Sequence, residues 1–512
     1  MTTSIEDRVG QMLMAGFNGL TAPAYILDWL REGRLGGIIL FARNVDSPAQ
    51  LAELTTQLHE ASKYPLLIGI DQEGGTVARL RDGFTESPGA MALASIRDHN
   101  EAATESISGV LAQEMHALGI NWTYAPTVDI SYNAANPSVG TRSFGSKPER
   151  VAALAAAAVR GFQGNGVAAC AKHFPGLGDT ALDTHLHLPR LNTSLEALLA
   201  TDLLPYREAI ASGLATIMTT HTVFNELDTE YPATLSKEIV TQLIRRELGF
   251  NGVVSTDCME MKAIDDHFAV SESVVRAANA EIDIILFSHT RGKQAAAYDH
   301  LLAAVKRGDV PEALVNAANE RIAALKARFP AAAADVTRVH TEANQRTMHE
   351  AARSAVTLVR SQAGVLPLRA DDSRQVLVVE FSPAVDSLIQ ESEVQTPLHK
   401  FMKAYLPHAR TLTLPASPAP EQVAVVAEYK PDVLVIATRN AHLNAKQTAA
   451  VRTLGQTDAT VILLALRNPY DAALLEGGTV LCTLGDSLPS QQVAGEALAG
   501  LFTPSGRLPV EV

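Results

Sequence analysis

Short apolar runs alternate with longer segments of helical spacing throughout the first 330 residues of the chain. This alternation constrains the fold most, because strands separated by amphipathic helices predict a parallel sheet that helices cover on both faces. The runs that we expect to be strands number eight, at residues 12–17, 37–41, 66–71, 123–128, 168–173, 215–221, 253–257 and 283–287. The expected helices lie at 49–62, 101–118, 149–162, 195–212, 237–248, 271–282, 293–307 and 312–329.

Eight such units in one stretch favour an α/β fold in which residues 1–335 form a closed (β/α)8 barrel of the TIM type. A doubly wound open sheet is the main alternative. No Gly-x-Gly-x-x-Gly motif follows the first apolar run, which weighs against a dinucleotide-binding form of that open sheet.

The rest of the chain has a similar pattern on a smaller scale. At 512 residues the chain is too long for one ordinary core, and an alanine-rich segment at 330–335 indicates a boundary. We expect a linker helix over 336–362 and then a smaller α/β/α sandwich over 363–512, with strands at 376–381, 411–414, 433–438, 461–466 and 479–483. This second unit contains no comparable cluster of titratable residues, so we expect it to have a supporting role.

Polar side chains stand at the carboxyl ends of four expected strands of the first unit. They are Asp71, Lys172, His173, His221 and Asp257. In barrel enzymes the carboxyl-terminal rim carries the active site, so convergence of these groups predicts a catalytic site there.

The segment 172–189 holds the densest group of candidate catalytic side chains in the chain, with one lysine, three histidines and two aspartates. Glycine and proline at 175, 176 and 178 indicate a loop. Asp183 precedes His185 by two residues, and a carboxylate at that spacing can fold back on the imidazole and fix its tautomer and basicity. A polar surface loop with incidental histidines is the alternative interpretation.

The rim suits hydrolysis of a glycosidic bond. A carboxylate at Asp257 has three open interpretations: a nucleophile, a metal ligand or a hydrogen-bond acceptor at a strand end. A retaining glycosidase needs a nucleophile and a proton-transfer group close together, and here the second group would be His185. A neutral imidazole repels an incoming anion less than a carboxylate does, so inorganic phosphate is a possible acceptor alongside water.

The order of the motifs is similar to that of the bacterial β-N-acetylglucosaminidases of glycoside hydrolase family 3. The matching motifs are Gly10-Gln-Met-Leu-Met14, Asp71-Gln-Glu-Gly-Gly75 with Arg79, Asn136-Pro with Gly140-Thr-Arg-Ser-Phe144, Lys172-His-Phe-Pro-Gly176, Asp183-Thr-His185, Thr220-His221, Ser255-Thr-Asp257 and Ser505-Gly-Arg-Leu-Pro-Val510. Together they cover almost the whole chain.

The resemblance implies a retaining exo-enzyme that removes terminal N-acetylglucosamine from muropeptide or chito-oligosaccharide fragments by double displacement. Asp257 would be the nucleophile, and His185 paired with Asp183 would be the acid/base. The terminal sugar would be bound by Asp71, Arg79, Arg142, Lys172 and His173. No cofactor or metal is implied.

One position departs from the resemblance. The family loop commonly reads Pro-Gly-His-Gly-Asp, whereas Leu177 stands here in place of that histidine. The acid/base dyad is unaffected, but the packing of the loop and its contacts on the leaving-group side are open.

Three other functions remain as alternatives. A family 3 β-glucosidase would use the same nucleophile. A metal-dependent barrel hydrolase would use His185 and His187 with His173, His221 and Asp257, since imidazole and carboxylate are ordinary zinc ligands. A non-catalytic sugar-binding protein would retain the scaffold alone.

Charge and composition exclude other classes of partner. The net charge of −14, from 42 basic and 56 acidic residues, disfavours nucleic acid as a partner. No apolar run approaches the ~20 residues of a membrane span, and the first residues do not read as a secretory signal. Three widely separated cysteines are typical of a reducing compartment, so we expect a cytoplasmic protein.

Overall fold

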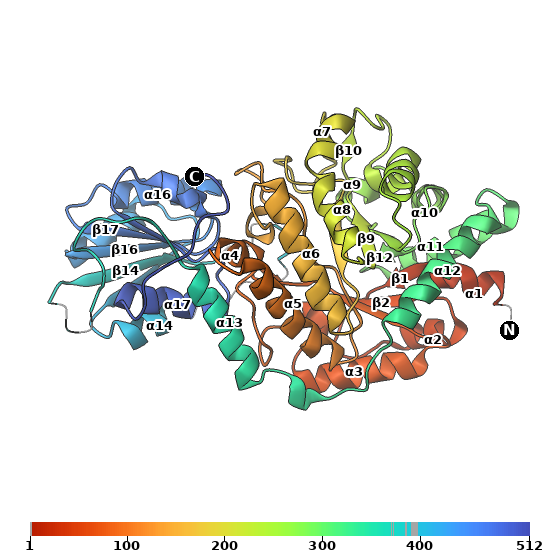
Figure 1. Ribbon diagram of the computed structural model, residues 1–512, viewed down its shortest axis with the longest axis horizontal. Coiled ribbons are helices and arrows are strands. Elements are labelled where there is room, and N and C mark those ends of the chain that lie inside the picture. The colour runs from red at the N-terminus through yellow and green to blue at the C-terminus, as the bar shows by residue number, and fades with distance from the viewer. Residues whose placement is uncertain (1–2, 370, 372, 384–386, 391–397) are drawn as a thin grey trace.

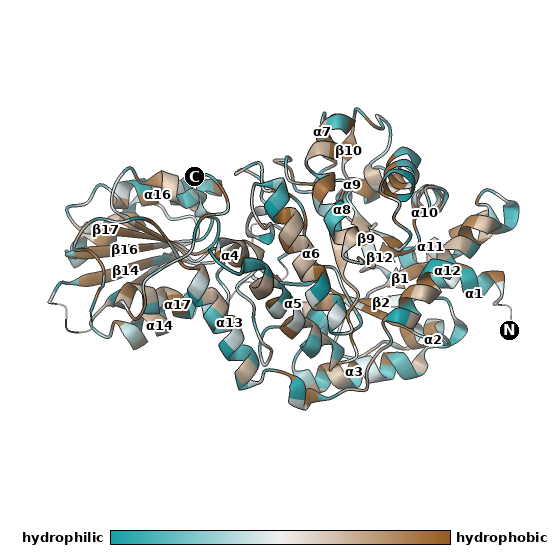
Figure 2. Ribbon diagram, in the orientation of Figure 1, coloured by the Kyte–Doolittle hydropathy of each residue, from teal (hydrophilic) through white to brown (hydrophobic). Residues whose placement is uncertain are grey.

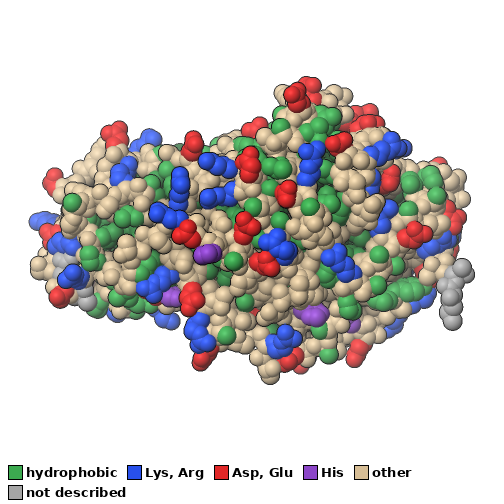
Figure 3. All heavy atoms as spheres, in the orientation of Figure 1, with side chains coloured by type: hydrophobic (Ala, Val, Ile, Leu, Met, Phe, Trp, Pro, Cys, Tyr) green, Lys and Arg blue, Asp and Glu red, His purple; other side chains and the backbone are tan. Residues whose placement is uncertain are grey.

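The computed structural model describes residues 3–369, 371, 373–383, 387–390 and 398–512. The chain has an α/β fold in two units, which lie side by side along the long axis in Figure 1. Within the described residues, no helix combines the length and the apolar character that crossing a membrane requires. Basic and acidic side chains are interspersed over the face in Figure 3.

Eight parallel strands form the centre of the first unit, and each of the eight runs expected to be a strand overlaps one of them. One sheet has the order β12-β1-β2-β3-β6 and the other has the order β11-β9-β7. Single parallel bridges link the two sheets on both sides, from Trp122 to Ala168 and from Ser255 to Ile284. The strands are β1 (Leu13–Ala15), β2 (Gly37–Leu40), β3 (Leu67–Ile70), β6 (Trp122–Thr123), β7 (Cys170–Phe174), β9 (Thr216–Thr219), β11 (Val253–Thr256) and β12 (Ile285–Phe287).

The fourth strand is shorter than the expected run 123–128. It ends at Thr123, and one isolated bridge between Thr127 and Lys172 resumes the pairing with β7. Pro126 lies in between and has no N–H to donate, so it interrupts the ladder.

Helices cover this sheet, and their starts follow ordinary capping chemistry. In α3 the Ser47 hydroxyl accepts from the Gln50 N–H and Pro48 occupies the first turn. The larger helices are α2 (Ala24–Glu32), α3 (Pro48–Ala61), α5 (Asn100–His116), α6 (Pro148–Gly164), α8 (Leu203–Ala211), α10 (Val270–Asn279), α11 (Arg291–Arg307) and α12 (Glu312–Arg328), with the shorter α1 (Ile5–Gln11), α4 (Ala90–Ser95), α7 (Leu195–Ala200) and α9 (Lys262–Asp265).

Three expected helices differ from the structure. The segment 195–212 is two helices, α7 and α8, because Pro205 has no N–H for the Thr201 carbonyl and fits only the first turn of a new helix. The segment 237–248 forms a π-helix over Glu238–Glu247. In the expected linker helix 336–362, only α13 (Glu342–Ala355) is α-helical.

Before α13 the segment has one short 3-10 helix, Val336–Arg338, and after it comes the strand β13 (Thr357–Arg360), which belongs to the second sheet. Its β-branched and aliphatic residues pair antiparallel with β18, so packing against the sheet prevails over continuation of the helix. The strand order of the second sheet is β13-β18-β17-β16-β14-β15. Its other strands are β14 (Val376–Phe381), β15 (Arg410–Leu414), β16 (Val433–Thr438), β17 (Thr460–Ala465) and β18 (Thr479–Cys482).

The strands at the centre of this second sheet are strongly apolar, as Figure 2 shows for β14, β16 and β17. Helix α16 (Ala445–Leu454) lies on one side of the sheet, and α14 (Leu398–Tyr405) and α17 (Leu488–Ala499) lie on the other (Figure 1). A continuous apolar strand covered on both sides is the pattern of a buried parallel sheet.

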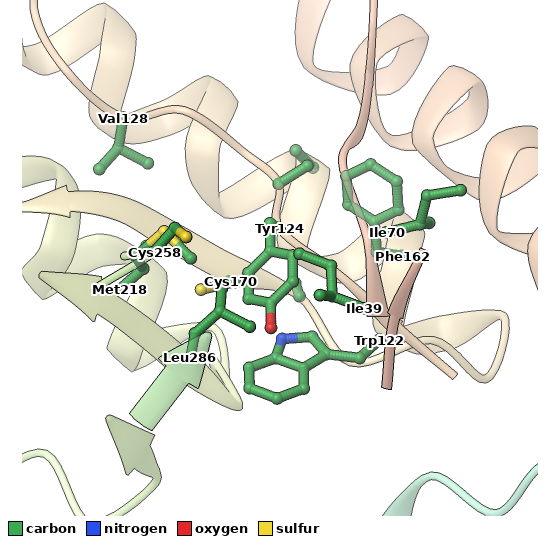
Figure 4. Packing of buried hydrophobic residues seen from close by; sticks show 14 of the residues in the cluster. Ile39, Ile70, Trp122, Tyr124, Val128, Phe162, Cys170, Met218, Cys258 and Leu286 are labelled. Atoms are coloured by element: carbon green, nitrogen blue, oxygen red, sulfur yellow. The ribbon is translucent and has the colours of Figure 1, made fainter. Parts of the chain in front are cut away.

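Large side chains fill the interior between the strands of the first unit (Figure 4). Trp122 and Tyr124 are fully buried there. The Trp122 indole donates to the Thr216 hydroxyl at 3.0 Å, and the Tyr124 hydroxyl contacts the Met14 sulfur at 2.7 Å. This packed interior forms a rigid base beneath the strand ends.

Candidate active site

A cavity of ≈ 300 Å³ lies over the carboxyl ends of the strands. Its apolar floor includes Ile39, Tyr124, Met218 and Leu286, four of the interior residues in Figure 4. Its wall includes seven of the eight expected site residues: Asp71, Arg79, Arg142, Lys172, His173, His185 and Asp257. A cavity of this size, with few convergent polar groups on an apolar base, is typical of a site for one small ligand.

Three buried cations and two buried carboxylates form a network at one end of the cavity. Lys172 Nζ lies 2.8 Å from Asp71 Oδ1 and 2.7 Å from Glu73 Oε1. Arg142 binds Glu73 through two parallel contacts, Nε to Oε2 at 2.9 Å and Nη2 to Oε1 at 2.7 Å. Arg79 Nη2 donates to Asp71 Oδ2 at 3.3 Å. These fixed polar groups can bind several hydroxyls of a sugar.

The network keeps its members charged. Burial raises the pKa of the Glu73 carboxyl, but Arg142 and Lys172 outweigh burial and hold that pKa well below its ordinary value. Burial opposes the charge of Asp71 in the same way, and Lys172 and Arg79 lower its pKa. Burial lowers and the two carboxylates raise the pKa of Lys172, and the carboxylates prevail.

Removing Glu73 should therefore destabilise the fold strongly. We expect Glu73→Ala to lower the free energy of unfolding by about 3–5 kcal/mol, because it leaves Lys172 and Arg142 buried without their shared partner. Denaturation in urea, followed by circular dichroism, measures this. The control is Glu247→Ala, which breaks the exposed pair with Arg207 and should change stability by less than about 0.5 kcal/mol.

The same network fixes the sign of the pH dependence. A carboxyl whose pKa is lowered by folding stabilises the protein above its unfolded pKa, and this stabilisation disappears as the pH falls toward the folded pKa. The wild-type protein should thus lose stability below the ordinary Glu value of 4.5, and Glu73→Ala should lose less over that range. Equal pH dependence in both proteins would contradict the account of the network.

His173 is held by a carboxylate that the sequence did not single out. Asp129 Oδ2 lies 2.7 Å from His173 Nδ1, and Asp129 Oδ1 accepts from the Leu177 N–H at 2.7 Å. Leu177 is buried, lines the cavity, and accepts from Asn136 Nδ2 through its carbonyl. The loop is therefore packed and hydrogen-bonded with leucine at this position.

His185 and Asp183 form the dyad that their spacing predicts. His185 Nδ1 lies 2.7 Å from Asp183 Oδ1, which also accepts from the His185 N–H at 2.9 Å. A carboxylate only accepts hydrogen bonds, so Nδ1 carries a proton and Nε2 is the nitrogen left for proton transfer. The His185 side chain is 21% exposed, which leaves it accessible to a ligand in the cavity.

Asp183 remains ionised beside this histidine. Burial raises the pKa of its carboxyl, but the hydrogen bonds from His185 and Ser387 outweigh burial and hold the pKa well below its ordinary value. Asp183 does not line the cavity itself; it acts on the cavity through His185.

Asp257 follows the last residue of β11 and lines the cavity. Its Oδ1 accepts from the Cys258 N–H at 2.7 Å. Burial raises the pKa of the Cys258 thiol to about 12, so this cysteine stays protonated and packs as a small apolar group.

Neither His221 nor His187 lines this cavity. Both ring nitrogens of the fully buried His221 are engaged, Nδ1 with the Thr234 hydroxyl and Nε2 with the Cys258 carbonyl, each at 2.9 Å. His187 is exposed and lies outside the cavity wall. Within the part of the chain that the structure describes, no three His, Cys, Asp or Glu side chains are grouped so as to hold a metal ion.

The second unit also reaches the cavity, which the sequence did not indicate. Leu388 and Ile389 line it. The Ile389 carbonyl accepts from Arg79 Nη1 at 2.7 Å, and the Ser387 hydroxyl donates to Asp183 Oδ2 at 2.8 Å. Nothing in the local pattern around these residues carries a signal, because their role depends on how the two units dock.

Comparison with known proteins gives one consistent family. The protein-family model described as glycosyl hydrolase family 3 N terminal domain matches residues 4–325 of this chain. Beta-hexosaminidase A of Pseudoalteromonas piscicida is 31% identical over 96% of this chain and 92% of its own. A beta-hexosaminidase of Alkalilimnicola ehrlichii is 36% identical over 56% of this chain and 84% of its own.

Solved structures agree with the sequence relatives. A glycoside hydrolase family 3 beta-N-acetylglucosaminidase from Paenibacillus sp. superimposes with a TM-score of 0.94 at 36% identity, over 100% of this chain and 99% of that chain. The similarity covers both units of the chain.

Proposed function

The chain belongs to glycosyl hydrolase family 3, and we propose that it is a retaining exo-β-N-acetylglucosaminidase that removes terminal N-acetylglucosamine by double displacement. The observation that carries this proposal is that Asp257 and His185, the latter held by Asp183, line one cavity together with a network of charged groups that can bind a sugar. The names of its relatives support the substrate, and these contacts support the roles of the residues.

In the first step Asp257 attacks the anomeric carbon of the terminal sugar. The bond from this carbon to the leaving oxygen breaks, and that oxygen takes the proton from Nε2 of the His185 imidazolium. The product is an ester between the sugar and the Asp257 carboxylate. Asp183 stabilises the imidazolium before the transfer and keeps the neutral ring in the tautomer with a proton on Nδ1.

In the second step neutral His185 takes a proton from water at Nε2. The water oxygen attacks the same carbon and releases Asp257, so two inversions give retention of configuration. Inorganic phosphate is a second acceptor for this step, because the neutral imidazole does not repel an anion; attack by a phosphate oxygen gives the sugar 1-phosphate.

The binding residues have distinct parts in this scheme. Asp71, Lys172 and Arg142 accept from and donate to the hydroxyls at the buried end of the cavity, with Arg79 and His173 beside them. Glu73 holds Lys172 and Arg142 in place. Because the network is complete before the sugar arrives, little rearrangement is needed on binding.

We infer that the eight strands form a closed (β/α)8 barrel. The ladders and the bridges at Trp122 and Ser255 give each strand a neighbour on both sides. The site then occupies the carboxyl-terminal rim, the place where barrel enzymes carry their chemistry. The second unit adds to this rim through Ser387, Leu388 and Ile389.

Two classes of natural substrate fit, muropeptide fragments and chito-oligosaccharides, and both present a terminal N-acetylglucosamine. The three cysteines are free and buried, which favours the cytoplasm, where muropeptide fragments are recycled.

Comparison of aryl glycosides tests the substrate. The purified protein should turn over an aryl β-N-acetylglucosaminide with a kcat/KM at least about a hundredfold above that for the matching β-glucoside, because a site that hydrogen-bonds a substituent of its substrate rejects an analogue that lacks it. Preference for the glucoside would favour the β-glucosidase alternative. Loss of activity after exhaustive chelation would favour the metal-dependent hydrolase alternative.

The same assay in phosphate buffer tests the acceptor. Release of sugar 1-phosphate beside free sugar is the expected result, and free sugar alone would exclude phosphorolysis.

A further inference from the structure

We infer that Ser387, contributed by the second unit, is a positioning residue for the acid/base dyad of the first unit. The inference rests on the proposed function, since it assigns to Ser387 an effect on proton transfer by His185. Ser387 and Asp183 lie 204 positions apart in the sequence, yet the serine Oγ donates to Asp183 Oδ2 at 2.8 Å.

The contact is buried on both sides. Ser387 is 4% exposed and Asp183 is 7% exposed. A hydrogen bond from a hydroxyl to a buried carboxylate is stronger than one between neutral groups, and a buried carboxylate oxygen without a donor carries a desolvation cost.

The two carboxylate oxygens of Asp183 have different hydrogen-bond partners. Asp183 Oδ1 accepts both hydrogen bonds from His185, one from the backbone N–H and one from Nδ1. Oδ2 accepts from Ser387. Because the terminal torsion of an aspartate is broad, two bonds to Oδ1 alone do not fix the plane of the carboxylate. The third bond, at Oδ2, does.

Fixing that plane has a consequence at the reacting atom. The direction of Oδ1 determines the orientation of the His185 ring, and hence where Nε2 points in the cavity. Proton transfer is sensitive to such orientation because donor and acceptor must come within hydrogen-bond distance along the correct line.

The segment is anchored to the sugar-binding end of the site as well. Two residues after Ser387, the Ile389 carbonyl accepts from Arg79 Nη1 at 2.7 Å. One short segment of the second unit thus contacts the acid/base dyad and a sugar-binding arginine together. Docking of the second unit completes the hydrogen bonds that position the dyad and Arg79.

Substitution of Ser387 tests the inference through the choice of leaving group. Ser387→Ala should lower kcat/KM for an unsubstituted phenyl β-N-acetylglucosaminide, a poor leaving group, by about tenfold or more. For the dinitrophenyl substrate, whose phenolate leaves without a proton, kcat/KM of this variant should stay within about twofold of the wild-type value. Ser387→Thr retains the hydroxyl and should restore most of the loss on the phenyl substrate.

Two further variants complete the experiment. Ser382→Ala changes a serine of the same unit outside the cavity wall and should leave both substrates unaffected. If Ser387→Ala does not fold, as judged by its thermal unfolding, Ser387→Cys replaces it, with a thiol of similar size that is a weaker donor and should give a smaller loss confined to the phenyl substrate.

Wild-type rates with Ser387→Ala on both substrates would overturn the inference, as would equal losses on both or failure of threonine to restore activity. Failure of the proposed function is a separate result: the wild-type protein would not cleave either aryl glycoside, or His185→Ala would lose both equally.

Discussion

Replacement of Asp257 with alanine is expected to reduce turnover of every glycoside substrate by at least about a thousandfold, since no covalent intermediate can form. The loss should appear for activated and unactivated leaving groups alike, because the displacement needs the nucleophile whichever group leaves. Binding of N-acetylglucosamine, measured by calorimetry, should persist, because Asp71, Lys172 and Arg142 remain in place.

The matched control for this variant is Asp179→Ala. Asp179 is an exposed carboxylate on the loop beside the dyad and does not line the catalytic cavity. It should retain the wild-type rate. Activity of Asp257→Ala near that of wild type would remove Asp257 from the mechanism, and loss of sugar binding together with turnover would leave only a binding role for it.

His185→Ala is expected to produce the second largest effect, and one that depends on the leaving group. For a phenyl glycoside, kcat/KM should fall by about 10²–10⁴-fold, the usual contribution of a positioned general acid. For a dinitrophenyl glycoside, kcat/KM should change little, because this phenolate departs without protonation. Steady-state assays over a series of aryl substrates measure the difference.

His187→Ala is the control for that series. It lies two residues further on, is exposed, and stands outside the cavity wall. It should behave as wild type with every leaving group. Losses of equal size across the series in His185→Ala would mean that this histidine orders the site in general and does not transfer the proton.

The local pattern of the sequence predicted the strand ends and the residues that stand on them. Asp71, Lys172 and Asp257 each follow or end an apolar run, and parallel strands bring their carboxyl ends to one edge. The Asp183–His185 dyad was predictable for the same reason, since both partners lie within one turn of the chain. Contacts between residues that are close in the sequence can be predicted from the local sequence.

Other parts of the site depend on contacts over long distances in the chain. Asp129 has ordinary surroundings in the sequence, and Glu73 lies within the motif at 71–75 with no local sign of its partner. Only the fold brings these carboxylates to His173 and Lys172. Ser387 is further removed still, because its contact requires two separate units to dock. The helix break before α8 and the early end of β6 could have been recognised, since Pro205 and Pro126 mark both.

The measurement that tests the central claim most directly is mass spectrometry of the His185→Ala variant after mixing with the dinitrophenyl β-N-acetylglucosaminide. Without its acid this variant still forms the glycosyl-enzyme from an activated substrate, and without its base it hydrolyses that ester slowly, so the intermediate should accumulate. We predict a peptide that contains Asp257 and carries the added mass of one N-acetylglucosaminyl group. An adduct on another residue, or burst release of dinitrophenol with the peptide unmodified, would contradict the assignment of Asp257 as the nucleophile.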